Sequence, residues 1–270
     1  MTNQGKKVLF VMSGGGMPGL DIHVGIWRAL EDMGIHATEI SGTSAGAIVG
    51  AMNASLWDPC SAEEYLRYHK DDDFRHERPF WKVRFPWLES IHDNDRIMVS
   101  LDGVLPLKWS GIKKPFSAWA CKKRNGELVN VARPELADRP AMAVLASMSI
   151  CGFFPAVPLL DGEDYIDGGY RFNLPLLNNW RDFDEVYLMI AKPRPSDYQG
   201  TGILTNLIRN LNIVMLNQIA DVLDHTQNAP AVRVIWPILG GETSMLRFNH
   251  DLIGQAYAFT INNMMKEVDV

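Results

Sequence analysis

Short apolar runs alternate with longer, helically spaced segments along most of this chain, and this alternation predicts an α/β fold. The runs that predict strands are residues 8–12, 37–41, 186–190 and 232–236. The segments with helical spacing are residues 20–34, 45–54, 203–225 and 251–268. The N-terminal part is therefore expected to form a strand, a glycine turn, a helix, a second strand, a tight turn and a second helix.

A G-x-S-x-G pentapeptide, from Gly42 to Gly46, lies between the second predicted strand and the helix at residues 45–54. Small residues on both sides of Ser44 suit a sharp strand-to-helix turn, since a larger side chain would meet the neighbouring backbone. Such a turn presents the serine hydroxyl as a nucleophile above the helix N-terminus. The alternative is a glycine- and serine-rich loop that caps a buried helix.

A second glycine cluster, Gly14-Gly15-Gly16 with Gly19 shortly after it, follows the first strand. Successive backbone N–H groups in such a turn accept negative charge, from either a phosphate or the oxyanion of an acyl transfer. The first and third glycines, together with Gly19, also fit G-x-G-x-x-G, and Glu39 lies where a dinucleotide-binding fold places its ribose acid. Because Ser44 follows so closely, we favour the oxyanion hole over the dinucleotide site.

Asp167 follows a short strand-like run and is itself followed by Gly168 and Gly169. An aspartate at a strand end, held by two glycines, can approach another loop closely. Alone, an Asp-Gly pair indicates only a turn. Combined with the two glycine-rich motifs, Asp167 becomes a candidate catalytic residue.

In this order and at these separations, the motifs at residues 14–19, 42–46 and 167–169 resemble the patatin-like phospholipase family. Ala146-Ser147, Phe154-Pro155, Asn173 and Pro175 extend the resemblance over most of the chain, from Val8 to about Ile190.

The resemblance implies a three-layer α/β/α sandwich with a mainly parallel central sheet, and catalysis by a Ser–Asp dyad without histidine. Ser44 would be the nucleophile and Asp167 the base. The remaining site residues implied are Gly14, Gly15 and Gly16 as oxyanion donors, Gly42 and Gly46 around the nucleophile, and Gly168 and Gly169 in the aspartate loop. No cofactor or metal is implied.

Two positions differ from the family pattern. The family usually has an aspartate before the glycines and an arginine or lysine near their end, whereas this chain has Ser13 and Pro18. Pro18 has neither a positive charge nor an N–H group. The strength of the oxyanion hole is therefore left open.

The proposed base needs an unusual environment, because an ordinary aspartate, with a pKa of about 3.9, accepts a serine proton poorly. A poorly solvated pocket would raise its proton affinity. The apolar stretch from Met142 to Leu160 is expected to supply the wall of that pocket. Attack by Ser44 would then give an acyl-enzyme, which Asp167 resolves by activating water.

A Ser-His-Asp triad is the mechanistic alternative, and in this chain order it would need a histidine after Asp167. His225 and His250 are the two candidates. His225 ends a long amphipathic helix and His250 lies beside an aspartate in a polar stretch, so both are expected to be surface or capping residues.

At 270 residues and 47% apolar, the chain suits one α/β domain over residues 1–270. Three widely spaced cysteines favour neither a disulfide framework nor a metal site. The longest uncharged stretch, residues 140–160, is broken by glycine and proline, so we expect no membrane-spanning helix and a soluble, cytoplasmic protein.

Charge is concentrated in residues 75–124, which carry eleven basic and five acidic residues in a chain of net charge −6. Four of the eight tryptophans lie there too. Basic residues interleaved with aromatics suit peripheral contact with an anionic membrane. We favour the interpretation that residues 72–125 form a cap or insertion within the domain, whose aromatics are its own core, over membrane contact. Nucleic acid binding is disfavoured by the net negative charge and the absence of a binding motif.

The sequence thus predicts a lipid acyl hydrolase, acting on phospholipid or lysophospholipid through Ser44 and Asp167. The alternative from another class is a catalytically weak lipid-binding or regulatory protein with the same fold. Head group, acyl-chain preference and oligomeric state are left open.

Overall fold

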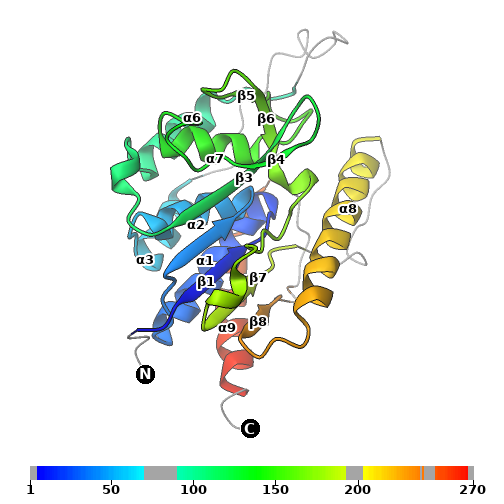
Figure 1. Ribbon diagram of the computed structural model, residues 1–270. Coiled ribbons are helices and arrows are strands. Elements are labelled where there is room, and N and C mark those ends of the chain that lie inside the picture. Colours follow the sequence, from blue (N-terminus) through cyan, green and yellow to red (C-terminus); the bar gives the residue numbers. More distant parts are fainter. Residues whose placement is uncertain (1–4, 70–89, 193–202, 238, 240–246, 267–270) are drawn as a thin grey trace.

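The computed structural model describes residues 5–69, 90–192, 203–237, 239 and 247–266. In this part of the chain, eight strands form one sheet between helices on its two faces (Figure 1). The strands are β1 (Val8–Met12), β2 (Glu39–Gly42), β3 (Phe116–Lys122), β4 (Leu128–Asn130), β5 (Val157–Pro158), β6 (Asp164–Asp167), β7 (Glu185–Met189) and β8 (Val232–Ile235).

The strand order is β5-β6-β3-β2-β1-β7-β8, with β4 paired to β3 beside this path. Strands β3, β2, β1, β7 and β8 run parallel, whereas β4 and β6 pair antiparallel with β3, and β5 antiparallel with β6. The predicted α/β fold with a mainly parallel sheet is therefore confirmed.

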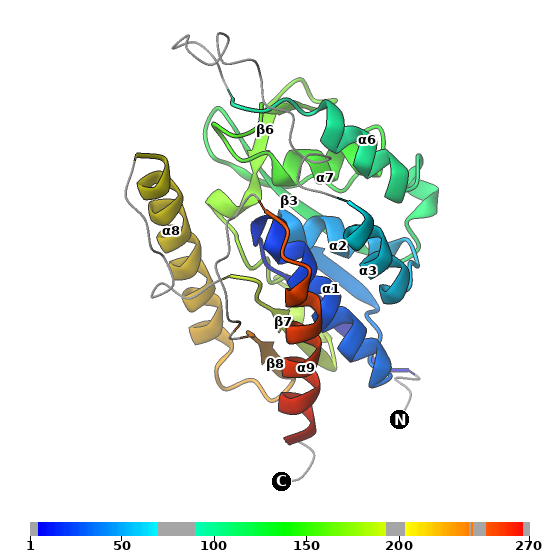
Figure 2. The ribbon, with the colours of Figure 1, turned by 180° about the vertical axis from the view of Figure 1, so that it is seen from behind.

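The helices form the outer two layers. They are α1 (Gly16–Asp32), α2 (Ala45–Ala54), α3 (Pro59–Tyr68), α6 (Asp95–Val104), α7 (Pro140–Met148), α8 (Ile203–Thr226) and α9 (Asp251–Lys266), with short 3₁₀ helices at Trp109–Gly111, Gly168–Tyr170 and Trp180–Asp182. Helices α1 and α9 pack side by side over one face of the sheet, and α8 lies on the opposite face (Figure 2).

Strand β1 shows how the sheet separates two apolar cores. All five of its residues are buried. Val8, Phe10 and Met12 belong to the core under α1, α2 and α9, whereas Leu9 and Val11 belong to the core under α8. A central parallel strand covered on both faces is expected to be apolar throughout, which explains why no polar alternation marks this strand in the sequence.

Helix α1 begins at Gly16, four residues earlier than the predicted start. Pro18 therefore lies in the first helical turn, where backbone N–H groups have no intrahelical acceptor. Its missing N–H does not weaken the helix. Gly16, the last residue of the glycine triplet, is therefore the first residue of α1.

The predicted cap at residues 72–125 is wrong at its C-terminal end. Residues 116–122 form β3, which pairs in parallel with β2 inside the sheet. Because most of β3 is buried on both faces, it lacks the alternation that would have marked it as a strand. Residues 72–89 lie outside the described part of the chain. Helix α6, in the remaining segment, packs on α7.

We predict opposite effects of alanine at two helical glycines. A Cβ atom on Gly46 would overlap the carbonyl group of Met12, whereas one on Gly103, exposed on α6, would contact nothing within 4 Å. Gly46→Ala should lower the free energy of unfolding by about 1–3 kcal/mol. Gly103→Ala should raise it by about 0.5–1 kcal/mol, because alanine favours helix. Urea unfolding of both variants tests this, and equal stabilities would contradict the close packing of α2 on β1.

Candidate active site

Ser44 stands at the turn between β2 and α2, at the carboxyl end of the parallel strands. Its backbone has φ 55° and ψ −121°, a strained conformation for a residue other than glycine. A side chain on Gly42 would overlap the Gly46 backbone, and one on Gly46 would overlap β1. The turn can therefore form only with glycine at both positions, and it places Ser44 over the start of α2.

Asp167 is the last residue of β6, which pairs antiparallel with β3. The side chain is buried, with 1% of its surface exposed. Its Oδ1 accepts a hydrogen bond of 2.6 Å from the Gly169 N–H, whereas its Oδ2 accepts none from any described residue. A side chain on Gly168 would overlap the Trp119 carbonyl group, so glycine is what allows the aspartate loop to lie against β3.

Burial raises the pKa of Asp167 from 3.8 to about 6, because the charged form loses its hydration. The Gly169 N–H, the Ser44 hydroxyl and the charge of Lys192 oppose this rise. Ser44 is thus close enough to act on the carboxyl group, although no hydrogen bond of ordinary length joins the two side chains. Catalytic hydrogen bonds are often long in the absence of substrate.

Of the three glycines predicted as oxyanion donors, two keep a backbone N–H group without an acceptor among the described residues. The prediction for Gly14 is wrong, because its N–H already donates to the Asn173 carbonyl oxygen at 3.0 Å. Gly14 instead permits close packing: a Cβ atom there would lie 3.3 Å from the Ser44 Cβ. The amides of Gly15 and Gly16 have no acceptor within the described ranges. The amide of Ala45, which sequence reasoning missed, is equally without an acceptor there and belongs to the residue after the nucleophile.

Ser13, one of the two departures from the family pattern, is a fully buried hydrogen-bonding centre. Its N–H donates to the Met189 carbonyl oxygen, and its Oγ accepts from the Ala191 N–H at 2.9 Å. His23 Nε2 donates to the Ser13 carbonyl oxygen at 2.7 Å. Burial lowers the pKa of His23 to about 4, so this imidazole is neutral near pH 7. Ser13 and His23 fix the glycine loop, and no local sequence signal marked His23.

Asn173 lies between the glycine loop, the aspartate loop and α8. It is fully buried, and its N–H donates to Gln218 Oε1 on α8 at 2.7 Å. A Cβ atom on Gly14 would lie 2.7 Å from Asn173 Nδ2, and one on Gly169 would lie 3.0 Å from it. The carboxamide of Asn173 has no hydrogen-bond partner among the described residues. It therefore lies between the glycine loop and the aspartate loop with its polar atoms unpaired.

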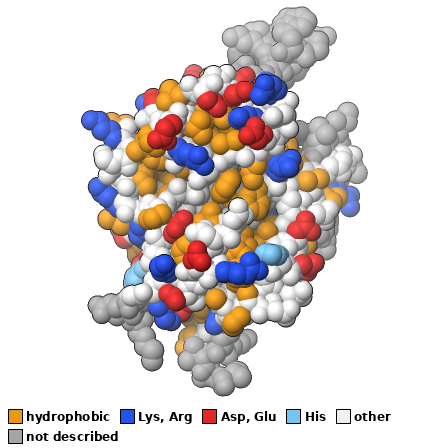
Figure 3. All heavy atoms as spheres, viewed as in Figure 1, with side chains coloured by type: hydrophobic (Ala, Val, Ile, Leu, Met, Phe, Trp, Pro, Cys, Tyr) orange, Lys and Arg blue, Asp and Glu red, His pale blue; other side chains and the backbone are white. Residues whose placement is uncertain are grey.

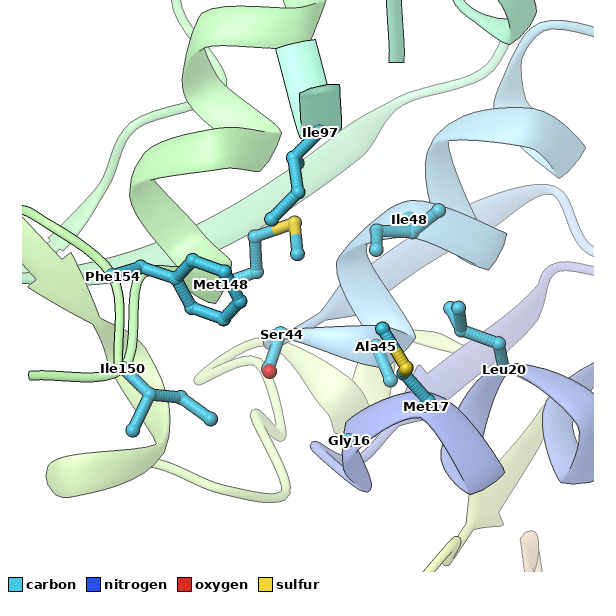
Figure 4. Close-up of a pocket in the computed structure, with 10 residues that line it drawn as sticks. All are labelled: Gly16, Met17, Leu20, Ser44, Ala45, Ile48, Ile97, Met148, Ile150 and Phe154. Carbon is cyan, nitrogen blue, oxygen red and sulfur yellow. The ribbon is translucent and has the colours of Figure 1, made fainter. Parts of the chain in front are cut away.

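An apolar pocket of about 440 Å³, including its open mouth, adjoins Ser44 (Figure 4). Its lining is Gly16, Met17, Leu20, Ser44, Ala45, Ile48, Ile97, Met148, Ile150 and Phe154. Three of these residues come from the stretch 142–160, which the sequence predicted as an apolar wall. The Ser44 hydroxyl is the one polar side-chain group in this lining, so the pocket suits an apolar ligand group.

The structure does not bring either late histidine to Ser44. His225 is exposed near the end of α8, where its ring meets Trp180 edge-on. His250 Nδ1 lies 2.9 Å from Asp21 Oδ1 and ties the start of α9 to α1. Neither histidine lines the pocket.

The dinucleotide alternative also fails on geometry. In the parallel pairing of β1 and β2, Glu39 lies opposite Leu9, whereas Met12, next to the glycine loop, lies opposite Gly42. Glu39 is thus three residues, or about 10 Å, from the end of the sheet where a ribose would bind.

Within the described ranges, no group of three or more histidine, cysteine, aspartate or glutamate side chains could hold a metal ion. None of the described helices is long and apolar enough to cross a membrane.

Comparison with known families matches residues 10–180 to the patatin-like phospholipase model. The chain belongs to this family. The resemblance found in the sequence is thereby confirmed, and the matched range contains the glycine loop, Ser44 and Asp167.

Curated patatin-like relatives are much longer proteins. The chain is 26% identical over 183 residues to patatin-like phospholipase domain-containing protein 6 of Mus musculus, covering 63% of this chain and 12% of that protein. It is 31% identical over 179 residues to lysophospholipase NTE1 of Phaeosphaeria nodorum, covering 63% and 11%. This chain thus matches about one eighth of their length.

Among solved structures, the patatin-like chain resembles VipD from Legionella pneumophila with a TM-score of 0.54. The sequences are 14% identical, and the match covers 98% of this chain and 67% of that one. This likeness concerns the fold.

We predict that the Asp167 carboxyl group titrates with a midpoint near pH 6, because its burial disfavours the charged form. Carbon-13 NMR of protein labelled in its aspartate carboxyl carbons measures this, and the resonance missing from Asp167→Asn gives the assignment. A midpoint near 4 would contradict a buried carboxyl group.

Proposed function

We propose that this protein hydrolyses the carboxylic esters of phospholipids or lysophospholipids through a Ser44–Asp167 dyad. The observation that carries this proposal is the buried Asp167 carboxyl group, with its Oδ2 unpaired and its pKa influenced by the Ser44 hydroxyl. Family membership supports lipid ester hydrolysis, and relatives that are named lysophospholipases support the substrate class.

The first half of the reaction forms an acyl-enzyme. Ser44 Oγ attacks the ester carbonyl carbon while its proton moves to Asp167 Oδ2, and the carbonyl oxygen becomes an oxyanion. The tetrahedral intermediate collapses, the bond to the alcohol oxygen breaks, and Asp167 returns the proton to this leaving group. In the second half, Asp167 takes a proton from water, whose oxygen attacks the acyl carbon. The second tetrahedral intermediate then collapses, the bond to Ser44 Oγ breaks, and Asp167 returns the proton to Ser44 Oγ as the fatty acid leaves.

The oxyanion is held by backbone donors. Gly15, Gly16 and Ala45 offer N–H groups without acceptors in the described structure, at the N-termini of α1 and α2. Helix N-termini add partial positive charge. Each donor would lower the barrier by roughly 3 kcal/mol. Because Pro18 lies in the first turn of α1, after Gly15 and Gly16, its missing N–H removes none of these three donors.

The apolar pocket fits the acyl chain of the substrate. Its side chains come from α1, α2, α6, α7 and the segment after α7, and none of them is charged. A lipid would therefore bind with its chain inside, its ester at Ser44 and its polar head toward the mouth.

Peripheral membrane contact through residues 75–124 stays a prediction, as does a cytoplasmic location. Three aromatics of this segment serve the fold: Phe116 is buried, and the indoles of Trp109 and Trp119 donate to Ala137 O and Ser41 Oγ. Basic and acidic side chains are interspersed over the face seen in Figure 3. Docking would have to use exposed groups such as Leu107 and Lys108.

We predict that Ser44→Ala and Asp167→Asn each lower kcat/KM on a lysophospholipid by at least about 1,000-fold, because each removes one of two groups that act together. Release of fatty acid measures the rate. The control is Ser110→Ala, at an exposed serine away from the pocket, which should retain wild-type activity.

Activity retained by either dyad variant would refute the dyad. A wild-type protein that binds lysophospholipid but releases no fatty acid would favour the lipid-binding alternative.

We predict that filling the pocket shortens the preferred acyl chain. Met148→Trp, at the end of α7 in the pocket wall, should lower kcat/KM for nitrophenyl laurate at least about 10-fold relative to nitrophenyl butyrate, since each lost methylene contact weakens binding. Met265→Trp, at an exposed position on α9, is the control and should leave the ratio unchanged. An unchanged ratio in Met148→Trp would contradict acyl binding here.

A further inference from the structure

Lys192 is a buried lysine that follows β7 at the carboxyl end of the sheet, with 4% of its surface exposed. Its backbone is fixed beside the glycine loop. Ala191, the residue before it, donates its N–H to Ser13 Oγ, and a Cβ atom on Gly15 would lie 2.5 Å from the Ala191 carbonyl oxygen. The Lys192 carbonyl oxygen accepts a hydrogen bond of 2.8 Å from the Trp236 indole.

The side chain of Lys192 is directed to α8. Its Nζ donates to Asn212 Oδ1 at 3.0 Å, and Asn212 is itself buried. Almost one turn further along α8, Met215 lies against the aspartate loop, since a Cβ atom on Gly169 would be 2.8 Å from Met215 Cε. Asn212 and Met215 lie three residues apart on α8. The Lys192 ammonium, held by Asn212, therefore lies on the side of the site where Asp167 lies.

The charges of Lys192 and Asp167 act on each other. Burial lowers the pKa of Lys192 to about 8, and the Asp167 carboxylate opposes this fall. In turn, Lys192 opposes the rise in the pKa of Asp167 that burial causes. Each group keeps the other ionised in an environment that disfavours both charges.

The other titratable groups that act electrostatically with Asp167 within the described chain are Cys121 on β3 and Tyr170 in the 3₁₀ helix after it. Burial raises the pKa of both, to about 11 for the thiol, so both are neutral near pH 7. Arg171 acts on Cys121. The charge that acts on the Asp167 carboxylate from these described elements is therefore that of Lys192.

We propose that Lys192 is the positioning residue of the dyad: its buried ammonium, held by Asn212, keeps Asp167 ionised and so sets the acidic limit of the reaction. This inference rests on the proposed hydrolase function. When Ser44 gives its proton to Asp167, the negative charge moves from the carboxylate to the ester oxygen. Before the proton transfer the anion near Lys192 is the Asp167 carboxylate, and afterwards it is the ester oxygen. The buried ammonium therefore has a compensating negative charge at both stages.

Lys192→Met tests the proposal, with Lys192→Arg as the matched control that keeps the charge. Without the ammonium, the Asp167 carboxylate loses its compensating charge and its pKa rises. We expect the carbon-13 titration midpoint of Asp167 to rise by about one unit in Lys192→Met and to stay near the wild-type value in Lys192→Arg. The acidic limb of kcat/KM for nitrophenyl butyrate should move equally, so that the rate falls about fivefold at pH 6 and little at pH 8.

A midpoint unchanged in Lys192→Met, or shifted equally in Lys192→Arg, would overturn the proposal. Circular dichroism confirms folding. If Lys192→Met does not fold, Lys192→Gln removes the charge, keeps a polar partner for Asn212, and carries the same expectation. The two proposals fail separately: a wild-type protein that cleaves no ester refutes the hydrolase function, whereas the NMR titration still measures whether Lys192 controls the ionisation of Asp167.

Discussion

Burial of the Asp167 carboxyl group is the constraint on which the rest of the site depends. A solvated aspartate is a poor base for a serine hydroxyl, and a pKa raised from 3.8 to about 6 strengthens it. The same burial lowers stability at neutral pH. Because the pKa is higher in the folded state, the contribution of this group is most favourable below pH 3.8 and is lost as the pH rises through 6. Gly169 and Lys192 offset part of that loss.

Close backbone approach is what makes the burial possible. The N-terminus of α2 meets β1 at Gly46, the aspartate loop meets β3 at Gly168, and the glycine loop meets the end of β7 at Gly15. At each of these points a Cβ atom would overlap or press on a neighbouring carbonyl group. Three helix or loop starts thus converge beside Ser44 and pack closely enough to bury Asp167.

Much of the site could be predicted from short local motifs in the sequence. The pentapeptide around Ser44, the strand before it and the helix after it depend on residues within one short segment, and the structure has them within two residues of the predicted bounds. Asp167 could be found because two glycines follow it, which the tight contact with β3 requires. The two-sided burial of β1 and β7 produced the apolar runs that predicted the sheet.

Features that depend on distant contacts could not be found in this way. The amide of Gly14 is occupied by Asn173, and the loop is held by Ala191, 178 residues from Ser13. Lys192 precedes the polar sequence Pro193-Arg194-Pro195, so no local pattern marks it as buried; its side chain is held by Asn212 on α8, a distant helix. The sequence places β3 in a cap because basic residues at its end continue a basic, aromatic segment. Its burial on both faces, which removes any alternation, depends on the neighbouring strands and helices.

Trapping the nucleophile tests the central claim most directly. A fluorophosphonate reacts with a serine that has an activating base and an oxyanion hole, and peptide mapping then locates the label. We predict a single label on Ser44 in the wild-type protein and none in Asp167→Asn. A label on another residue, or undiminished labelling of Ser44 without Asp167, would contradict the account.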